Sequence, residues 1–470
     1  MKKSGVLGFI ISSIFLAGCA GTTTNLGQIG KSGNYESSQK TGNYTALAQN
    51  LKKNQKDDLL WYLDAGLISR YAQDTNATIY FFDKSEDKIK QYDKEVLAGT
   101  LLANAGAILT NDTFMDYRPK IYEGIMVNTY KGLSFMDKGD MSNARIEFNR
   151  ALERQRRAKE FFAKEIKQEK KKIEAQEAQK IKKKKLNVAQ VQKVSSNDNT
   201  KDAIEKRYSN LFAFKPYPDF VNPFSSYMAG LFFISVHDYA KATDILKETY
   251  GMIKSNEAGA DYVKRDLKYA IKASSSLNSS SDEHFAWVIF ENGEGPSKKE
   301  NRFDIPLFLV TNRLSYAGIA LPTFQENQAA YSYLTIYDGN KSVRTKKIAS
   351  MDKIIKTEFK KRFPAVMTRA ITRTVAQSLM QYELNRQGGL IGLIGAVYQG
   401  FMNRADTRQW NTLPKNFQIA RIALSSPKLS IVSPDGRRNI ELIVDTDKNH
   451  IVLIRIPKHN SKEIVYEVSF

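Results

Sequence analysis

Small and bulky apolar residues recur at fixed spacing in three stretches of the first 275 residues. Gly66, Gly132 and Gly230 each lie in an apolar run, and each is followed by a small residue after twelve positions, a bulky one after sixteen and a small one after nineteen. Small residues let two helix backbones approach, and the bulky residue fills the space beside them. The pattern therefore predicts three pairs of packed antiparallel helices. The small positions are Thr78, Ser85, Ala144, Ala151, Ala242 and Thr249, and the bulky positions are Phe82, Phe148 and Leu246.

Apolar residues in the second half of the chain follow a strand-like pattern. Short runs of β-branched and aromatic residues at 284–290 and 331–337 predict strands, as do the closing runs NIELIVD, HIVLIRI and EIVYEVSF. SPDGRR and DTDKN supply hairpin turns between them. We therefore expect an α+β fold. A helical-repeat domain over residues 50–275 precedes a β-rich domain over residues 283–470, which carries a helical insertion at about 350–405.

The expected insertion contains a helix with a small residue at every fourth position. In QGGLIGLIGAVYQGF these residues are Gly388, Gly392, Ala396 and Gly400. Each glycine destabilises a helix interior by about 1 kcal/mol, so several together require close contacts in compensation. A stripe of this kind lets two helices approach, as in membrane dimers. We expect it to serve core packing, or else a contact with a second copy or with a membrane surface.

A long basic segment interrupts the expected helical domain at about residues 154–205. Strong helix formers dominate RQRRAKEFFAKEIKQEKKKIEAQEAQKIKKKKL, so the segment predicts a long helix. Residues 154–185 contain 14 basic and 5 acidic residues. Such a helix is either a solvated projecting arm or a surface for an anionic partner, for which peptidoglycan and anionic lipid are the candidates.

The first 18 residues have the three parts of a bacterial export signal, namely Lys2 and Lys3, an apolar run and small residues before Cys19. The apolar run of about 11 residues is shorter than the roughly 20 needed to span a bilayer. FLAGC resembles the lipobox of bacterial lipoproteins, and Cys19 is the only cysteine in the chain. The resemblance implies a signal peptide over residues 1–18, cleavage between Gly18 and Cys19, and lipid on the Cys19 sulfur. A secretory signal with a chance cysteine is the alternative.

Composition extends this prediction to the residues that follow. Residues 19–49 are rich in Gly, Thr, Ser and Asn and predict a flexible tether. Ala20, in place of aspartate, implies sorting to the outer membrane by resemblance to other lipoproteins. The net charge of +21 favours anionic partners. Because export removes the protein from the cytoplasm, we expect no nucleic-acid partner.

Longer stretches of the sequence resemble a known protein family. The central repeat, YKGLSFMDKGDMSNARIEFNRAL, resembles the tetratricopeptide consensus at Gly132, Phe135, Gly139, Ala144, Phe148 and Ala151. Together with VIFENGEGPSKKENRFDIPL, GIALPTF and NRADTRQWNTLPKNFQIARI, it is similar to a family of bacterial lipoproteins that carry tetratricopeptide repeats. The resemblance implies an envelope protein that acts with other lipoproteins, and it supplies no catalytic residues.

Motifs for chemistry are incomplete. LGQIGKS lacks the first glycine of a phosphate-binding loop, and the four histidines have no metal-site spacing. DTDKN begins like a calcium loop, but His450 and Ile456 stand where glycine and glutamate belong. Asp406 and Arg408 are expected to form a structural ion pair. We therefore expect no metal, no cofactor and no enzymatic activity.

These observations favour a lipid-anchored scaffold on the periplasmic face of the outer membrane. Its expected partners are other envelope or motor proteins and lipoproteins, and a flagellar-motor disk is the specific hypothesis. A homo-oligomer is compatible with the glycine stripe. The alternatives are a lipoprotein regulator of peptidoglycan synthesis or cell-wall binding, and an unrecognised hydrolase.

Overall fold

The computed structural model describes residues 28–100, 116–184, 202, 204, 206–218, 220–275, 283–306, 316–386 and 404–470. Within these ranges the helices come first and the sheets follow, which confirms the α+β class. The helical part begins with η2 (Ile29–Lys31), α2 (Gly33–Thr41) and α3 (Thr45–Lys53). Three helical pairs follow: α4 (Leu59–Tyr71) with α5 (Thr75–Ala98), α6 (Ile121–Asp137) with α7 (Met141–Lys184), and α11 (Pro223–Ser235) with α12 (Tyr239–Ile253). The short α10 (Ser209–Ala213) precedes the third pair, and α13 (Ala260–Ser275) follows it.

The three pairs turn from one helix into the next with the same geometry. Seven residues after each predicted glycine, one residue takes a positive φ, and the next residue is an aspartate whose side chain caps the second helix. The backbone N–H of this aspartate also donates to the carbonyl five residues earlier, over 2.8 to 2.9 Å. The residues with positive φ are Gln73, Gly139 and His237, and the capping residues are Asp74, Asp140 and Asp238.

Each of the three glycines lies against the bulky residue sixteen positions later. A Cβ added at any of them would lie 2.6 to 2.9 Å from that side chain, which is closer than side chains pack. The pairs are Gly66 with Phe82, Gly132 with Phe148, and Gly230 with Leu246. The bulky residues and the small residues expected beside them are buried, and Phe135 packs against the same core. The absence of a side chain at each glycine therefore makes room for the neighbouring helix.

Three sheets form the second half of the described chain. The central sheet has the order β11-β10-β1-β7-β6, in which β1 and β10 are parallel and the other neighbours antiparallel. A second sheet is the hairpin β2-β3, and a third has the order β5-β4-β8-β9. The strands are β1 (Phe285–Asn292), β2 (Ser297–Pro306), β3 (Tyr316–Gln325), β4 (Thr335–Asp338), β5 (Lys341–Arg344), β6 (Lys346–Ser350), β7 (Asn416–Ala423), β8 (Lys428–Val432), β9 (Asn439–Ile443), β10 (His450–Ile456) and β11 (Ile464–Ser469).

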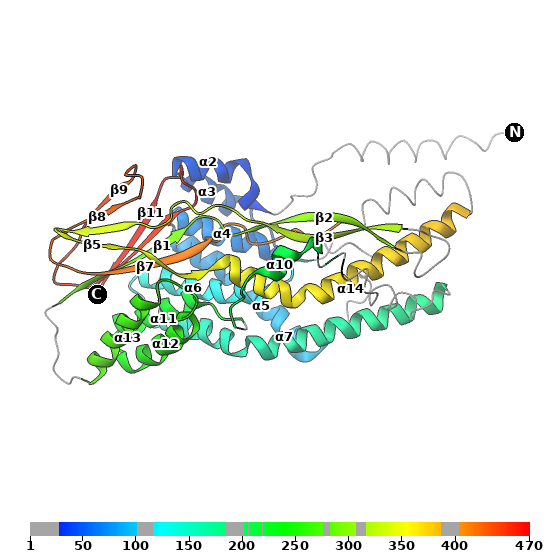
Figure 1. Cartoon of the computed structure of the whole chain (residues 1–470), viewed down its shortest axis with the longest axis horizontal. Coiled ribbons are helices and arrows are strands. Elements are labelled where there is room, and N and C mark those ends of the chain that lie inside the picture. The colour runs from blue at the N-terminus through cyan, green and yellow to red at the C-terminus, as the bar shows by residue number, and fades with distance from the viewer. Residues whose placement is uncertain are drawn as a thin grey trace.

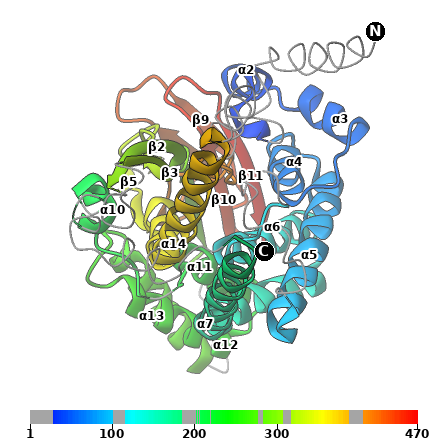
Figure 2. The same ribbon diagram turned by 90° about the vertical axis from the view of Figure 1, so that its right-hand side faces the viewer.

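The helices and the central sheet share one hydrophobic core, which runs from Tyr35 to Val468. All residues of β1 and β10 are buried, as expected for strands that are covered on both faces. Asp266 of α13 joins the layers, because it accepts hydrogen bonds from Trp287 Nε1 (2.9 Å) and from Arg421 (2.8 Å). The helical and β-rich parts therefore form one body, with the helices arranged around the sheet (Figures 1 and 2).

Two long helices run side by side along the long axis of the molecule (Figure 1). One is α14 (Met351–Arg386), which lies within the helical insertion expected at about 350–405. The other is α7, which contains residues 154–184 and confirms the long helix predicted there. That basic helix is therefore the continuation of the second helical pair and does not interrupt it. Gly388, Gly392, Ala396 and Gly400 lie outside the described residues.

The flexible tether predicted over residues 19–49 is wrong for its described part, because η2, α2 and most of α3 occupy it. Tyr35 and Tyr44 are fully buried in the core and hold these helices on the body. The polar residues that suggested flexibility act as caps. Ser32 Oγ accepts the Tyr35 N–H, and Gly42 ends α2 with a φ of 70°. Residues 1–27, which include Cys19, lie outside the described residues.

Asp64 of α4 is buried and connects the N-terminal segment with the loop before β7. Its Oδ1 accepts a hydrogen bond from Thr412 Oγ1 (3.0 Å), and its Oδ2 accepts one from the Gly30 N–H (3.4 Å). Burial raises the pKa of Asp64 from 3.8 to about 7, although both hydrogen bonds oppose the shift.

Gly66→Ala should destabilise the protein by about 1–3 kcal/mol, because the new methyl group overlaps the buried Phe82 ring. Gly251→Ala in α12 is the matched control. Nothing lies within 4 Å of a Cβ at Gly251, so this variant should gain about 0.5–1 kcal/mol from the loss of a helical glycine. Urea denaturation measures both free energies of unfolding, and equal effects would contradict the close contact.

The free energy of unfolding of the wild type should fall as the pH rises from about 4 to 7, because Asp64 ionises in this range. Asp64→Asn should abolish this fall. In this window the folded state binds more protons at Asp64 than the unfolded state does. The unfolding free energy therefore falls as pH rises, by about 1.4 kcal/mol per unit of pKa difference. Asparagine resembles the protonated carboxyl. The free energy of unfolding of the variant should therefore equal that of the wild type near pH 4 and exceed it above about pH 7. Thermal denaturation of both proteins across this pH range measures the difference in stability. If the stabilities of variant and wild type changed with pH in the same way, the role of Asp64 would be contradicted.

Candidate functional site

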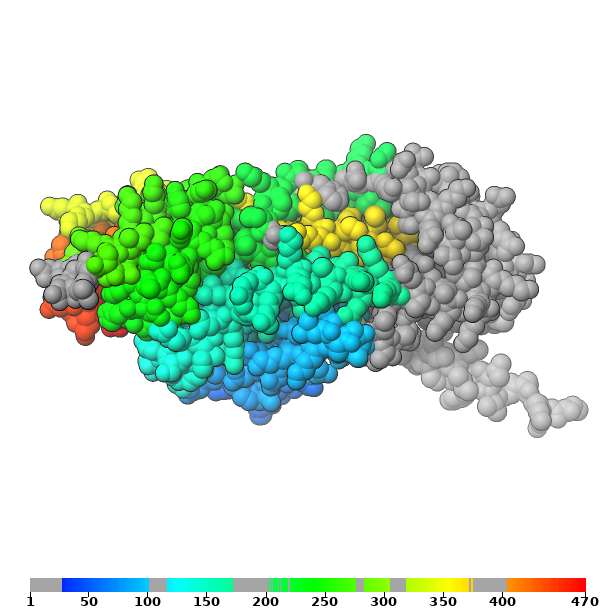
Figure 3. All heavy atoms as spheres, turned by 90° about the horizontal axis from the view of Figure 1, so that it is seen from below, coloured from blue at the N-terminus to red at the C-terminus, as the bar shows by residue number. Residues whose placement is uncertain are grey.

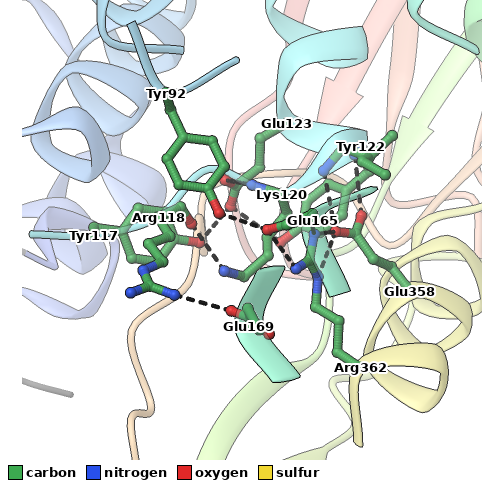
Figure 4. A network of polar contacts seen from close by, with 11 residues as sticks. Tyr92, Tyr117, Arg118, Lys120, Tyr122, Glu123, Glu165, Glu169, Glu358 and Arg362 are labelled. Carbon is green, nitrogen blue, oxygen red and sulfur yellow. Dashed lines mark hydrogen bonds and ion pairs between the residues drawn. The ribbon is translucent and has the colours of Figure 1, made fainter. Parts of the chain in front are cut away.

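A buried network of charged and tyrosine side chains lies where α7 and α14 pass the start of α6 (Figure 4). Its members come from α5, the segment before α6, α6 itself, α7 and α14. They are Tyr92, Tyr117, Arg118, Lys120, Tyr122, Glu123, Glu165, Glu169, Glu358 and Arg362.

Arg362 of α14 is the centre of this network. Its Nη1 and Nη2 donate to the two oxygens of Glu165, both over 2.8 Å, and its Nε and Nη2 donate to Glu358 Oε1 over 3.0 and 2.8 Å. Tyr92 OH donates a further hydrogen bond to Glu165 Oε1 (2.6 Å). Burial opposes the charge of Arg362, but the two carboxylates raise its pKa above the ordinary value. The bidentate pair compensates for the water that these charges lose.

Glu358 connects this network to the N-terminus of α6. Its two oxygens accept hydrogen bonds from the backbone N–H groups of Ile121 (3.1 Å) and Tyr122 (3.2 Å). These N–H groups have no partner within their own helix, and the positive end of the helix dipole favours a carboxylate there. Glu123 adds a local cap, because its Oε2 accepts the Lys120 N–H over 2.8 Å. A side chain of α14 therefore fixes the start of α6.

Glu169 connects α7 to the segment before α6 and to α14. Arg118 donates to Glu169 Oε1 (2.9 Å), and Arg369 of α14 lies 3.2 Å from the same oxygen. Burial opposes ionisation of Glu169, but Arg369 and Arg118 outweigh it and lower its pKa to about 2. Each network carboxylate thus accepts hydrogen bonds from charged, tyrosine or backbone donors. The network is suited to holding helices in place.

A groove of about 900 Å³ lies beside the network, between α5 and α7. Figure 3 shows these two helices side by side on one face of the molecule. Leu97 and Ile146 line the groove and are 61% and 46% exposed, which is unusual for large apolar side chains. Charged side chains surround them. The lining residues include Lys90, Lys120, Arg150, Arg154, Arg157 and Lys164 together with Glu86, Asp93, Glu153 and Glu160. An apolar surface with a charged rim is typical of sites that bind protein segments.

The other residues singled out in the sequence are not members of this network or groove, although Arg408 borders the network, with its guanidinium carbon 5.7 Å from the centre of the Tyr117 ring. The repeat residues pack within the helical pairs. Asp406 and Arg408 form the expected ion pair, with Arg408 Nε 3.0 Å from Asp406 Oδ1. DTDKN forms a turn in which Asp445 Oδ1 accepts the Asp447 N–H. Across the described residues, no group of three acidic, histidine or cysteine side chains could hold a metal, and no helix is long and apolar enough to cross a membrane.

Sequence reasoning missed the network, although two spacings point to it. Glu165 and Glu169 lie four residues apart on α7, and Glu358 and Arg362 lie four residues apart on α14. Residues at this spacing share one face of a helix. The sequence could therefore suggest two charged helix faces, but not that they meet.

No protein-family model, curated protein or solved structure matches this chain.

Arg362→Met should destabilise the protein by about 3–5 kcal/mol, because Glu165 and Glu358 would remain buried without their cation. Arg156→Met is the control, since Arg156 forms an exposed pair with Glu153 and should change stability by less than about 0.5 kcal/mol. Urea denaturation measures both effects.

Replacing Glu165 and Glu358 with glutamine in the Arg362→Met variant should recover part of the lost stability, because no buried carboxylate then remains without its cation. A similar loss in the Arg156 and Arg362 variants, or no recovery, would contradict the role of Arg362.

Proposed function

We propose that this protein is a lipid-anchored scaffold subunit that binds partner proteins at the periplasmic face of the outer membrane. The FLAGC sequence supports the anchor, with Cys19 as the lipidated residue and cleavage after Gly18. Eight residues, 20–27, separate Cys19 from the first described residue. The tether that the composition predicts for these residues would span about 17 Å on average, which would place the body close to the membrane.

The helical pairs support the scaffold part of the proposal. Their common turn and glycine contact are compatible with tetratricopeptide-like repeats, which use packed helical pairs to present a binding surface. Consecutive pairs contact each other, and all of them share the core of the central sheet, so the binding surface would be the outer one between α5 and α7.

The groove between α5 and α7 is the single observation that carries the docking role. We assign it to a segment of a partner protein with apolar and acidic side chains. Leu97 and Ile146 offer apolar contacts, and six basic against four acidic side chains line the groove. With a chain charge of +21, this balance attracts an acidic partner.

The specific assembly that we propose is a disk of the flagellar motor, whose components would be other envelope proteins and lipoproteins. A second candidate is a regulator of peptidoglycan synthesis or of attachment to the cell wall. The basic helix favours this second role, because residues 154–185 carry 14 basic and 5 acidic residues and wall carboxylates are anionic.

Photo-crosslinking in living cells should capture a flagellar-motor protein from positions 97 and 146. A photoreactive residue at Ile443, which is 76% exposed on β9, is the matched control and should not capture that protein. Capture of a peptidoglycan synthase from the groove would support the second candidate. The same capture from all three positions, or none from the groove, would contradict docking there.

The anchor is tested separately by Cys19→Ser. This variant should lose incorporation of labelled palmitate and leave the outer-membrane fraction, because the sulfur that carries the lipid is gone. A variant that still fractionates with the outer membrane would contradict anchoring through Cys19.

A further inference from the structure

A second cavity lies on the other side of the charge network, enclosed by the segment before α6, α14, β2, β3 and the chain before β7. Its volume is about 110 Å³, and eight basic but only three acidic side chains line it. The arginines among them already have partners, which leaves the two lysines of the cavity for a ligand.

Two of the three acidic side chains are already engaged by arginines. Glu169 accepts from Arg118 and lies beside Arg369. Asp406 forms a bidentate pair with Arg408, with 3.0 Å from Nε to Oδ1 and 3.0 Å from Nη2 to Oδ2. The charge of Asp406 also acts on Lys298, but neither carboxylate forms an ion pair with a lysine of the cavity.

Lys120 and Lys298 are those lysines, and each uses its ammonium group in one hydrogen bond to a carbonyl. Lys120 Nζ donates to Arg118 O (2.8 Å), and Lys298 Nζ donates to Arg408 O (3.3 Å). Within the described part of the chain, neither Nζ has a carboxylate oxygen within 4.0 Å. An ammonium group has three donors, so each lysine retains donors for a ligand.

The electrostatic environment of the two lysines agrees with this geometry. Burial and the positive charge of Lys120 together lower the pKa of Lys298 to about 8, although Asp406, Glu123 and Glu358 oppose the shift. Burial and the positive charge of Arg362 lower the pKa of Lys120, and the nearby glutamates oppose this shift. For both ammonium groups the net effect of lost water and of neighbouring charges is unfavourable. An anion that contacts both would offset this cost.

We propose that this cavity binds a phosphate-class oxyanion through the ammonium groups of Lys120 and Lys298. Its volume of about 110 Å³ is several times the roughly 10–15 Å³ that one ordered water requires, so a compact anion fits. The same phosphate chemistry occurs in free inorganic phosphate and in the phosphomonoester of a lipid headgroup. The argument for this site does not rest on the scaffold role or on a partner in the groove.

The test is titration of the purified full-length chain with inorganic phosphate, against sodium chloride at matched ionic strength. Calorimetry should show saturable binding, and phosphate should raise the melting temperature above that in chloride. Lys120→Gln and Lys298→Gln should each weaken binding about ten- to hundredfold, the loss expected for one hydrogen bond to a charged group. Lys341→Gln, at an exposed lysine on β5, is the matched control and should bind as the wild type does.

A measurement without phosphate keeps the test valid if a variant folds poorly. Lys298→Gln removes a destabilised buried charge, so its melting temperature in chloride should equal or exceed that of the wild type.

Phosphatidylcholine vesicles with and without phosphatidate distinguish free phosphate from a lipid headgroup as the source of the oxyanion. Binding to phosphatidate vesicles that free phosphate displaces identifies a headgroup, and binding of free phosphate alone identifies the ion. Absence of saturable phosphate binding, or wild-type affinity in both lysine variants, would overturn the proposal.

Discussion

Arg362 pairs with two buried glutamates, and this interaction forms the joint that holds the long helices α7 and α14 together. Glu165 and Glu358 come from different helices, and neither could be buried there as a charge without this guanidinium. Glu358 in turn satisfies two N–H groups at the start of α6. One cation therefore fixes the relative positions of α6, α7 and α14. The groove and the small cavity both border this joint.

The same principle joins the helices to the central sheet. Asp266 of α13 binds side chains of β1 and β7, and the hydroxyl of Tyr71 in α4 accepts from Arg455 of β10 (3.1 Å). These polar contacts lie within the shared hydrophobic core, where each hydrogen bond is stronger because water is excluded. They also fix how the layers align, which apolar packing alone specifies poorly. The molecule is therefore one body, although its sequence changes character between residues 275 and 283.

What could be predicted from the sequence depended on how far apart the partners are in the chain. Gly66 and Phe82 are sixteen residues apart, so the spacing that brings them together is visible in one window. Glu165 and Arg362 are 197 residues apart, and nothing local indicates that they meet. The predicted tether failed for a different reason. Composition averages over a segment. It conceals that Tyr35 and Tyr44 enter the core while Ser32 and Gly42 cap the two ends of α2.

Lys120 lines both the groove and the small cavity, so the two proposed ligands would share one charge. An oxyanion held by Lys120 and Lys298 would lower the positive potential at that end of the groove and weaken an acidic partner there. Linkage requires the reverse effect to be equal, so a partner in the groove would weaken the oxyanion by the same factor. A partner whose contacts there are apolar, at Leu97 and Ile146, would instead be indifferent to the anion. Acidic contacts would therefore make binding at the two sites mutually unfavourable, and purely apolar contacts would leave the two sites uncoupled.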